Sequence, residues 1–486
     1  MKPRGSMSIY FSLMTAVMVS LICTSILSVK VSCGRMRAAD SADQAMYSLF
    51  ARYDRKLMQN YDLFFLDAGG AGGGPCVGAA LAEVESAMDA VLDPGKDCPV
   101  LAGRSLLTLV RTGGYVCGYT LATDAGGAPF EAQAISAMKD TAGIEALSLL
   151  KERTGEAVSS AEAGESLLAE SSSVSYQEIQ ECSEETRTAA EEEGVEIITE
   201  VPEDFVNPLP ALETLKRGSV MDLVLPDGRA VSGKAVDPAS LVSGRDLQSG
   251  VGVIDASGGS GGSSMYFKGW ILAHFKDFTE PEEACGLTYQ LEYLLAGKPG
   301  DRENLKSIIT RLLLLREAAN IACLYGDAQK SAELTEMAGL ISIFLLIPEA
   351  EPLIKLLLAA GWAYAESLVD VRGLLEGKRV AAVKSAANWQ TDLEGLAQSG
   401  GDISGLAEDM PGGLTYREYL AGMLMVTPGR KLLSRSMDLV ESHMQGLGRP
   451  SFRLDSCICA LSVEIQVRSE NMVTFPVVKE LSYQDL

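Results

Sequence analysis

The stretch GSMSIYFSLMTAVMVSLICTSILSV, residues 5–29, contains no charged residue and lies near the start of a chain of 486 residues. At about 1.5 Å of rise per residue, a helix of this length crosses a bilayer core of roughly 30 Å. Basic residues flank it, with Arg4 before it and Lys30 and Arg35 after it. We therefore expect residues 1–31 to form a short cytoplasmic tail and a transmembrane helix.

The helical pattern continues beyond the predicted membrane surface. Apolar side chains recur at three- to four-residue spacing, at Met46, Leu49, Phe50, Tyr53, Leu57, Tyr61 and Phe64. This spacing is typical of an amphipathic helix. No glycine or proline interrupts the series before Asp67. We expect one unbroken helix that leaves the membrane as a stalk, with a helical cap around it up to residue 150.

A cleavable signal peptide is the first alternative for the apolar run. Signal peptides have an apolar region of about 7–15 residues and then a small-x-small cleavage site. Here the run is longer and meets Lys30-Val31-Ser32-Cys33 without such a site. We therefore expect a retained single-pass anchor in the cell membrane, with membrane lipid as its partner. Basic residues flank the span on both sides, so the charge rule alone does not decide its orientation. The arrangement that we expect is a short cytoplasmic tail with the large acidic bulk of the chain outside the cell.

Hydroxyl-bearing residues occur on almost every turn of the predicted span, at Ser12, Thr15, Ser20, Thr24, Ser25 and Ser28. Small residues allow helices to approach closely in lipid, and hydroxyls can bond across the interface or back to their own backbone. Two interpretations stay open. The span is either a lone anchor that tolerates these residues or a helix that packs against other membrane helices.

The segment Arg4-Gly5-Ser6-Met7-Ser8-Ile9-Tyr10-Phe11 resembles the start of TadE/TadG-type pilin-like proteins of tight-adherence (Flp) pilus systems. The resemblance implies prepilin-type processing between Gly5 and Ser6, and partners among other pilin-like membrane helices. That family usually has a glutamate at the fifth mature position, where this chain has Tyr10. This departure argues against a major polymer subunit.

A second resemblance covers most of the chain. The stretches that carry it are 61–67, 123–126, 133–134, 222–226, 292–298, 316–320, 362–367 and 412–416. On these stretches the chain is similar to an uncharacterised family of membrane-anchored Firmicutes proteins, a domain of unknown function often found near such pilus genes. The resemblance implies no catalytic residues.

The acidic composition limits the class of partner. The formal net charge is −24 at pH 7, so no basic stripe is present to neutralise phosphates, and a nucleic-acid partner is not expected. The chain has 10 cysteines, which is too few for a disulfide scaffold at this length. Those outside the membrane region could pair in an oxidising compartment, but their spacing does not define which would.

Changes of composition divide the remainder of the chain. Residues 156–204 include 15 acidic residues and one basic residue, which favours a solvated linker or exposed helix over a metal-binding patch. Short strands are expected at 195–198 and 220–225. The expected segments are 32–150, stalk and cap; 151–205, acidic linker; 206–250, small β-containing segment; 251–264, Gly/Ser linker; 265–450, helical domain; and 451–486, β-hairpin.

The C-terminus changes from helical to strand periodicity. Apolar residues alternate strictly from Cys457 to Val467, which predicts a strand with one buried face. A turn and a second strand follow, and Pro476 places that strand at a sheet edge. Such a hairpin needs a hydrophobic partner, and the apolar stripe at 46–64 is one candidate; that packing resembles a pilin-like head. The expected fold class is α+β, mainly α, with a helical extracytoplasmic domain.

The sequence contains few residues arranged for catalysis. Its two histidines, His274 and His443, lack metal-ligand spacing to any cysteine or carboxylate. The glycine clusters lack the lysine and hydroxyl residue of a phosphate loop, and no G-x-S-x-G motif occurs. We expect no enzymatic activity, no metal and no cofactor.

Several polar residues lie within otherwise apolar helices: Arg316, Glu317, Asn320, Glu366, Asp370 and Arg372. Paired carboxylates could serve acid–base chemistry. A structural ion-pair network between packed helices explains the same residues with fewer assumptions.

Two functions remain as hypotheses. The first is an accessory pilin-like component of a tight-adherence pilus or a related surface assembly. The second is a monomeric anchored module of the cell envelope that is unrelated to pili.

Overall fold

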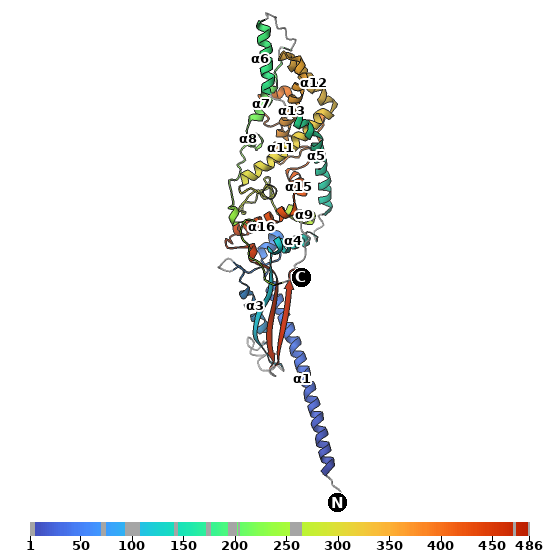
Figure 1. Cartoon of the computed structure of the whole chain (residues 1–486), viewed down its shortest axis with the longest axis vertical. Coiled ribbons are helices and arrows are strands. Elements are labelled where there is room, and N and C mark those ends of the chain that lie inside the picture. Colours follow the sequence, from blue (N-terminus) through green and yellow to red (C-terminus); the bar gives the residue numbers. More distant parts are fainter. Residues whose placement is uncertain are drawn as a thin grey trace. The chain divides into compact units, whose positions relative to one another are not determined.

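The fold is mainly α-helical with a small antiparallel sheet, as the sequence predicts (Figure 1). The computed structural model describes residues 5–69, 74–92, 107–139, 144–171, 176–192, 202, 205–252, 265–469 and 473–484. The predicted strand at 195–198 and residues 253–264 of the predicted Gly/Ser linker lie outside these ranges. Two compact units form: unit 1 is Met1–Asp140, Val242–Gly262 and Met444–Leu486, and unit 2 is Thr141–Leu241 and Ser263–His443.

Unit 1 contains four α-helices and the sheet within its described residues. These are α1 (Gly5–Phe50), α2 (Arg55–Tyr61), β1 (Leu66–Asp67), α3 (Val77–Leu92), β2 (Leu109–Leu121), α4 (Asp124–Lys139), η4 (Leu454–Ser456), β3 (Cys457–Ser469) and β4 (Thr474–Ser482).

The regular elements of unit 2 are all helices within its described residues. Its elements are α5 (Ile144–Ser171), α6 (Tyr176–Glu192), α7 (Leu209–Arg217), α8 (Val220–Val224), η1 (Pro238–Ser240), α9 (Met265–His274), α10 (Gln290–Ala296), α11 (Asp301–Gly326), α12 (Ala328–Phe344), η2 (Pro348–Ala350), α13 (Glu351–Leu375), η3 (Ala386–Asn388), α14 (Leu393–Gln398), α15 (Tyr416–Val426) and α16 (Gly429–Gly446), which runs into unit 1.

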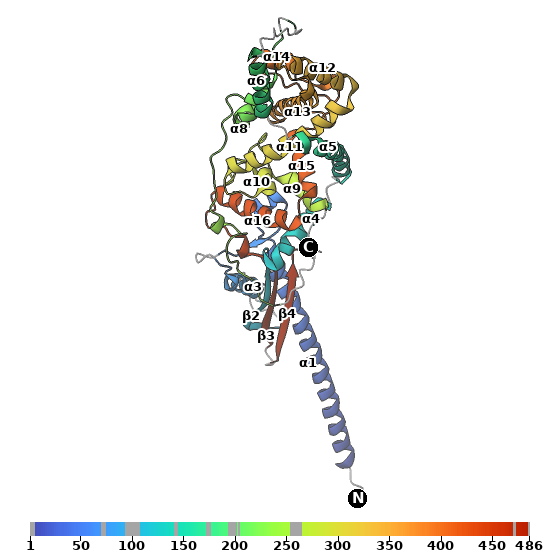
Figure 2. The same cartoon turned by 45° about the horizontal axis from the view of Figure 1, so that its top comes forward.

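Strand β3 is the centre of the sheet. It pairs antiparallel with β2 along one edge, and with both β4 and the short β1 along the other. The predicted C-terminal hairpin is therefore confirmed as β3–β4, and β4 lies at the edge, where Pro476 does not interrupt a ladder. Figure 2 shows β2, β3 and β4 beside one half of α1, while the other half extends past the sheet.

The C-terminal half of α1 covers the apolar face of this sheet. Met46, Leu49 and Phe50 pack in one hydrophobic core with alternate residues of β3. This part of the apolar stripe at 46–64 is therefore the partner that the sequence predicts for the hairpin. Smaller residues precede them on the same face: Ala38 and Ala42 are fully buried. A Cβ built on Gly34 would lie 3.5 Å from Leu109 and 3.6 Å from Phe475. Small side chains at four-residue spacing therefore allow the helix to approach the sheet closely.

This close approach predicts a cost for any larger side chain. Ala42→Leu should destabilise unit 1 by about 1–3 kcal/mol, because a tightly packed interface has no room for three more carbons. Hydrogen exchange of the β3 amides measures the effect. The control Gln44→Leu changes an exposed position on the same helix; equal exchange in the two variants would contradict the packing.

The prediction of one unbroken helix up to Asp67 is wrong. Helix α1 ends at Phe50, and a new helix begins because the Asp54 carboxylate accepts hydrogen bonds from the backbone N–H groups of Lys56 and Leu57. Helix α2 ends at Asp62, which adopts a left-handed conformation with a φ of 55°. Aspartate is an effective helix cap, and this signal outweighed the apolar spacing.

Strand β2 lies where the sequence predicts only a helical cap. Three of its residues are glycines, which lower the apparent strand propensity. Two of these glycines allow close approach: a Cβ on Gly114 would lie 2.8 Å from Glu85 Oε1, and one on Gly118 would lie 2.8 Å from the Val251 carbonyl. The strand therefore uses glycine where neighbouring elements contact its backbone.

One strand prediction fails in unit 2. Residues 220–225 are not a strand: Met221 and Val224, three residues apart, place the buried side of helix α8 against α13. The acidic segment, expected as a solvated linker or an exposed helix, forms helices α5 and α6 in its described part, and α5 packs on α11. Ala157 and Gly164 lie on the buried side of α5, and a Cβ on Gly164 would overlap the Ala318 carbonyl. The acidic side chains occupy the opposite, solvated side.

Helix α13 is the core of unit 2. Every residue from Leu357 to Leu375 is buried, although by length and composition alone the helix could span a membrane. The apolar run at 337–347, predicted as a buried core helix, forms the end of α12 and the turn after it.

Candidate functional site

The N-terminal half of α1 is an exposed apolar surface. Met7 and Val29 are 69% and 62% exposed, and the large apolar residues between them are exposed as well. The helix is long and apolar enough to cross a membrane, by length and composition. Gly5 and Ser6, the predicted processing site, are its first two residues. A surface of this kind is unstable in water and needs lipid or protein to cover it.

Three of the hydroxyl groups in this part of α1, those of Thr15, Thr24 and Ser25, bond to the helix itself. The Thr15 hydroxyl donates to the Phe11 and Ser12 carbonyls, and the Ser25 hydroxyl donates to the Leu21 carbonyl at 2.8 Å. The Thr24 hydroxyl does the same at 2.9 Å. These groups are therefore satisfied without a neighbouring helix.

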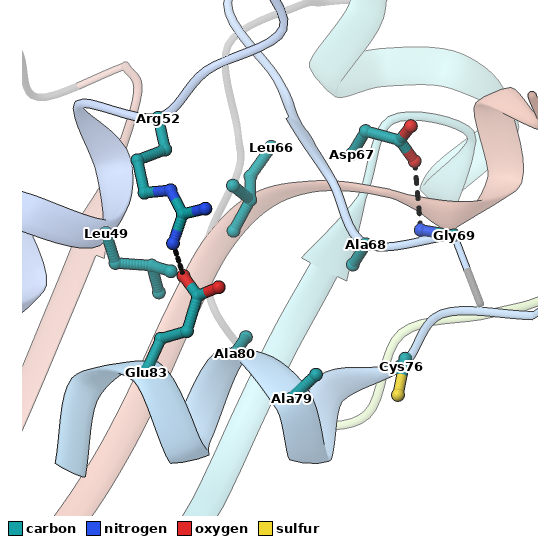
Figure 3. A pocket seen from close by; sticks show the side chains of 10 residues that line it. All are labelled: Leu49, Arg52, Leu66, Asp67, Ala68, Gly69, Cys76, Ala79, Ala80 and Glu83. Carbon is teal, nitrogen blue, oxygen red and sulfur yellow. Dashed lines mark hydrogen bonds and ion pairs between the residues drawn. The ribbon is translucent and has the colours of Figure 1, made fainter. Parts of the chain in front are cut away.

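A cavity of about 210 Å³ lies in unit 1 between the end of α1, β1 and the start of α3 (Figure 3). Its polar lining is already paired: Arg52 forms an ion pair with Glu83 at 2.6 Å, and the Asp67 carboxylate accepts from the Gly69 N–H and binds Arg449. The remaining lining consists mainly of alanine and leucine side chains. The cavity offers no unpaired charge with which to bind a ligand.

Unit 2 contains a fully buried cluster of two cations and two carboxylates: Arg316, Lys384, Glu366 and Asp370. Arg316 Nη2 lies 2.9 Å from Asp370 Oδ2, and Lys384 Nζ lies 2.8 Å from Asp370 Oδ1. Lys384 also binds Glu366. The four charges sum to zero, as a buried site requires.

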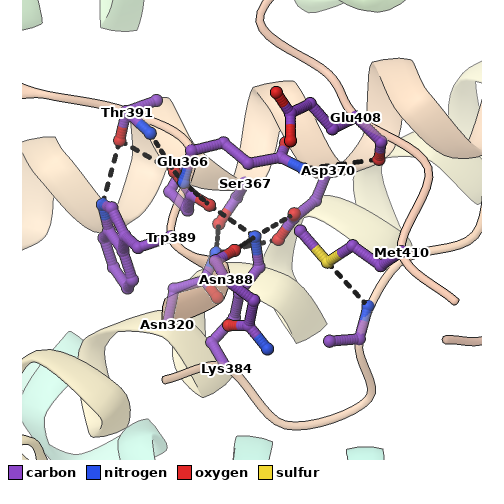
Figure 4. Close-up of polar contacts among 12 residues, drawn as sticks. Asn320, Glu366, Ser367, Asp370, Lys384, Asn388, Trp389, Thr391, Glu408 and Met410 are labelled. Carbon is purple, nitrogen blue, oxygen red and sulfur yellow. Dashed lines mark hydrogen bonds and ion pairs between the residues drawn. The ribbon is translucent and has the colours of Figure 1, made fainter. Parts of the chain in front are cut away.

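Neutral groups add hydrogen bonds to this cluster, and Figure 4 shows those that Asn320 and Thr391 make to Asp370 and Glu366. Arg316 Nη1 donates to the carbonyls of Ala381 and Ala382 at 3.0 and 3.1 Å. The Thr391 hydroxyl donates to Glu366 at 2.8 Å, and Asn320 donates to Asp370 at 3.1 Å. The cluster thus joins α11 and α13 to the chain segment that follows α13.

Electrostatics favour the charged forms of Asp370 and Arg316. Burial alone would raise the pKa of Asp370, but the charges of Arg316 and Lys384 outweigh it and lower that pKa. Burial likewise opposes the charge of Arg316, and Tyr419 and Asp370 raise the pKa of Arg316 above its ordinary value. Because two cations lower its pKa, the Asp370 carboxylate is not available to exchange protons at neutral pH.

The six predicted network residues separate into two groups. Arg316, Asn320, Glu366 and Asp370 meet in the buried cluster. Arg372 lies elsewhere, where it binds Asp227 at 2.8 Å and Glu376 at 3.2 Å.

Glu317 is also separate from the cluster and is partly buried. Burial raises its pKa to about 7, with Lys216 opposing the shift.

Sequence reasoning missed Lys384 and Thr391, which lie in irregular chain after α13. The only available signal was that two buried carboxylates and one buried arginine need a second cation to balance their charges.

Another buried carboxyl, that of Glu292, was not predicted as a site from the sequence. Glu292 Oε1 accepts hydrogen bonds from the Phe278 N–H and the Tyr416 hydroxyl, both at 2.8 Å, and its Oε2 has no hydrogen-bond partner. Burial and the nearby Asp277 raise the pKa of Glu292 to about 8, with these two hydrogen bonds opposing the shift. This raised pKa favours the neutral carboxylic acid form of Glu292 at pH 7.

The histidines and cysteines do not form a site within the described residues. His274 Nδ1 lies 2.9 Å from the Trp270 carbonyl, and His443 Nε2 lies 4.0 Å from Glu282. The nine cysteines of the described chain are free thiols, and Cys98 lies outside it. No group of three metal-ligating side chains occurs among the described residues.

These features define a mainly helical α+β protein with an exposed apolar N-terminal helix and a buried cluster of paired charges. A family of unknown function, DUF5702, matches residues 199–469, more than half of the chain. The protein belongs to this family. No curated protein and no solved structure matches the chain.

The family match overlaps only part of the resemblance found in the sequence. It includes the stretches at 222–226, 292–298, 316–320, 362–367 and 412–416. The stretches at 61–67, 123–126 and 133–134 precede it. The buried cluster and Glu292 lie inside the matched range, whereas α1 lies outside it.

Proposed function

We propose that this protein is a non-catalytic, membrane-anchored extracytoplasmic protein that acts as an accessory pilin-like component of a tight-adherence/Flp-type pilus or a related surface assembly. One observation carries the proposal. A single continuous helix, α1, has an exposed apolar N-terminal half, and its C-terminal half packs on an antiparallel sheet. A subunit of this shape can insert one half of its helix into lipid or among other helices while its sheet stays in water.

Two further observations support this placement. The net charge of −24 suits a body that remains soluble outside a membrane. The buried carboxylates of unit 2 are held by ion pairs and by burial, and the described cavity in unit 1 has a fully paired polar lining. These features favour a binding or structural role over catalysis.

The test is the N-terminus of the mature protein. We expect N-terminal sequencing and intact mass of the membrane-extracted protein to show a chain that begins at Ser6. A mature chain that begins at Met1 would contradict pilin-type processing. Gly5→Leu should block the cleavage, whereas Gly34→Ala, which changes a glycine of the same helix outside the segment, should not.

The internal hydrogen bonds of the α1 hydroxyls favour a second candidate, a monomeric anchored module of the cell envelope. Thr15, Thr24 and Ser25 are satisfied by their own helix, so these three hydroxyls do not require a polar partner. Crosslinking in intact cells separates the two candidates. Crosslinks from the span to other membrane helices support the assembly, and an uncrosslinked monomer supports the module.

A further inference from the structure

The first charged residues that follow the apolar half of α1 are all basic. Lys30, Arg35 and Arg37 precede the first acidic residue of the helix, Asp40. At 1.5 Å of rise per residue, residues 7–29 extend about 35 Å, slightly more than a hydrocarbon core. The headgroup layer adds roughly 6 Å on each side. With the span in a bilayer, these three cations lie in or just above the headgroups.

One end of the sheet lies at the same level of the helix. A Cβ built on Gly34 would lie 3.5 Å from Leu109 and 3.6 Å from Phe475, which fixes this level. The Arg35 guanidinium lies 5.8 Å from the centre of the Phe475 ring. Arg468 is the cross-strand neighbour of both Val110 and Thr474 at this end. Arg468 is exposed, and Val110 is 53% exposed. The sheet therefore adds a fourth cation and an exposed apolar side chain to the same level.

These four cations have no carboxylate partner within the described residues. Nearby cations of unit 1 differ: Lys479 binds Asp43 at 2.7 Å, and Arg111 binds Asp89 at 2.9 Å. The chain is acidic overall, yet at the end of the apolar half of α1 it has four cations that no carboxylate of the described residues neutralises. Negative charge on a membrane surface complements such a cluster, and the attraction acts within about 10 Å at moderate salt.

We propose that Lys30, Arg35, Arg37 and Arg468 form a headgroup-binding surface for anionic phospholipids. This inference rests on the membrane anchoring in the proposed function. Binding at this surface holds the end of the sheet against the bilayer and so fixes the height of unit 1. The attraction is electrostatic and therefore weakens as salt rises.

The experiment uses the full chain in nanodiscs that contain equal amounts of phosphatidylcholine and phosphatidylglycerol. Native mass spectrometry measures which lipid remains bound to the protein when the protein is released from the nanodisc. We expect preferential retention of phosphatidylglycerol. Replacing all four cations with glutamine should lower the preference more than tenfold, since each basic group near an anionic surface is worth about fivefold in affinity. The matched control replaces four exposed basic residues of unit 2, Arg302, Lys306, Arg430 and Lys431, and should keep the preference.

A second measurement locates the contact and checks folding. Backbone amides at 109–112 and 466–469 should exchange more slowly in the mixed nanodiscs than in phosphatidylcholine alone. Flotation with phosphatidylcholine vesicles tests the anchor separately, and the four-residue variant should still float. Flotation without any lipid preference overturns this inference alone. A wild-type chain that does not float overturns the proposed anchor, and the inference with it.

Discussion

Arg316→Met should lower the free energy of unfolding of unit 2 by about 3–5 kcal/mol, because it removes one cation from a closed group of buried charges. Asp370 and Glu366 would then share only Lys384, at sites without solvent exposure. The carbonyls of Ala381 and Ala382 would also lose their donor. For a unit of this size, the thermal midpoint should fall by on the order of 10 °C.

Tryptophan fluorescence reports this unfolding directly. Trp362 and Trp389 both donate a hydrogen bond to the Thr391 hydroxyl, which in turn donates to Glu366. The control Arg217→Met removes an arginine that is 73% exposed and paired with Glu213, a pair worth about 0–1 kcal/mol. An Arg316→Met midpoint equal to that of the control would show that the cluster does not stabilise unit 2.

The parts of the fold that the sequence predicts are those with one dominant local signal. Strand β3 alternates apolar and polar residues from Leu461 to Val467, and an alternating strand buries one face wherever it is placed. The first part of the strand, residues 457–460, is apolar throughout and buried on both faces. The exposed half of α1 follows from a charge-free run, because no folded core is needed to recognise it. In both elements the local pattern and the tertiary environment agree.

The parts that the sequence does not predict depend on contacts between distant residues. Strand β2 has glycines because Glu85 and the Val251 carbonyl approach its backbone, and neither contact is visible in the strand itself. The stripe from Met46 to Phe64 continues across Asp54, but capping by that residue starts a second helix. Small residues on α5 identify a packed helix within a segment whose composition suggests a linker.

The same limit applies to the buried charges. Helical spacing places Arg316 and Asn320 on one face of α11, and Glu366 and Asp370 on one face of α13, so four of the six predicted residues meet. Arg372 and Glu317 belong to the same helices but point elsewhere. Lys384 comes from irregular chain, whose path has no sequence periodicity.

Glu292→Gln should remove most of the dependence of unit 2 stability on pH between about 5 and 8. The pKa of this carboxyl is raised from 4.5 to about 8 by burial and by Asp277. Between these values the folded protein holds a proton that the unfolded chain has lost. Stability therefore falls as pH rises through this window, by up to about 1.4 kcal/mol per pH unit. The total loss is on the order of 4 kcal/mol at pH 8 and above.

The glutamine side chain is uncharged at every pH in this range and keeps an oxygen for the Phe278 N–H and the Tyr416 hydroxyl. We therefore expect the variant to be close to the wild type near pH 5 and several kcal/mol more stable at pH 9. Chemical denaturation followed by tryptophan fluorescence at each pH measures both values.

Two further variants make the result specific. Glu317 contributes a smaller slope of the same sign, since burial raises its pKa to about 7 while the group stays partly exposed. The stability of the double variant Glu292→Gln/Glu317→Gln should therefore depend less on pH than that of either single variant. Glu336→Gln removes an exposed carboxylate of α12 and should keep the wild-type slope. If the stability of Glu292→Gln depended on pH as steeply as that of the wild type, Glu292 would be ionised in the folded protein. Its unpaired Oε2 would then be a buried negative charge beside Asp277, which burial of both groups strongly disfavours.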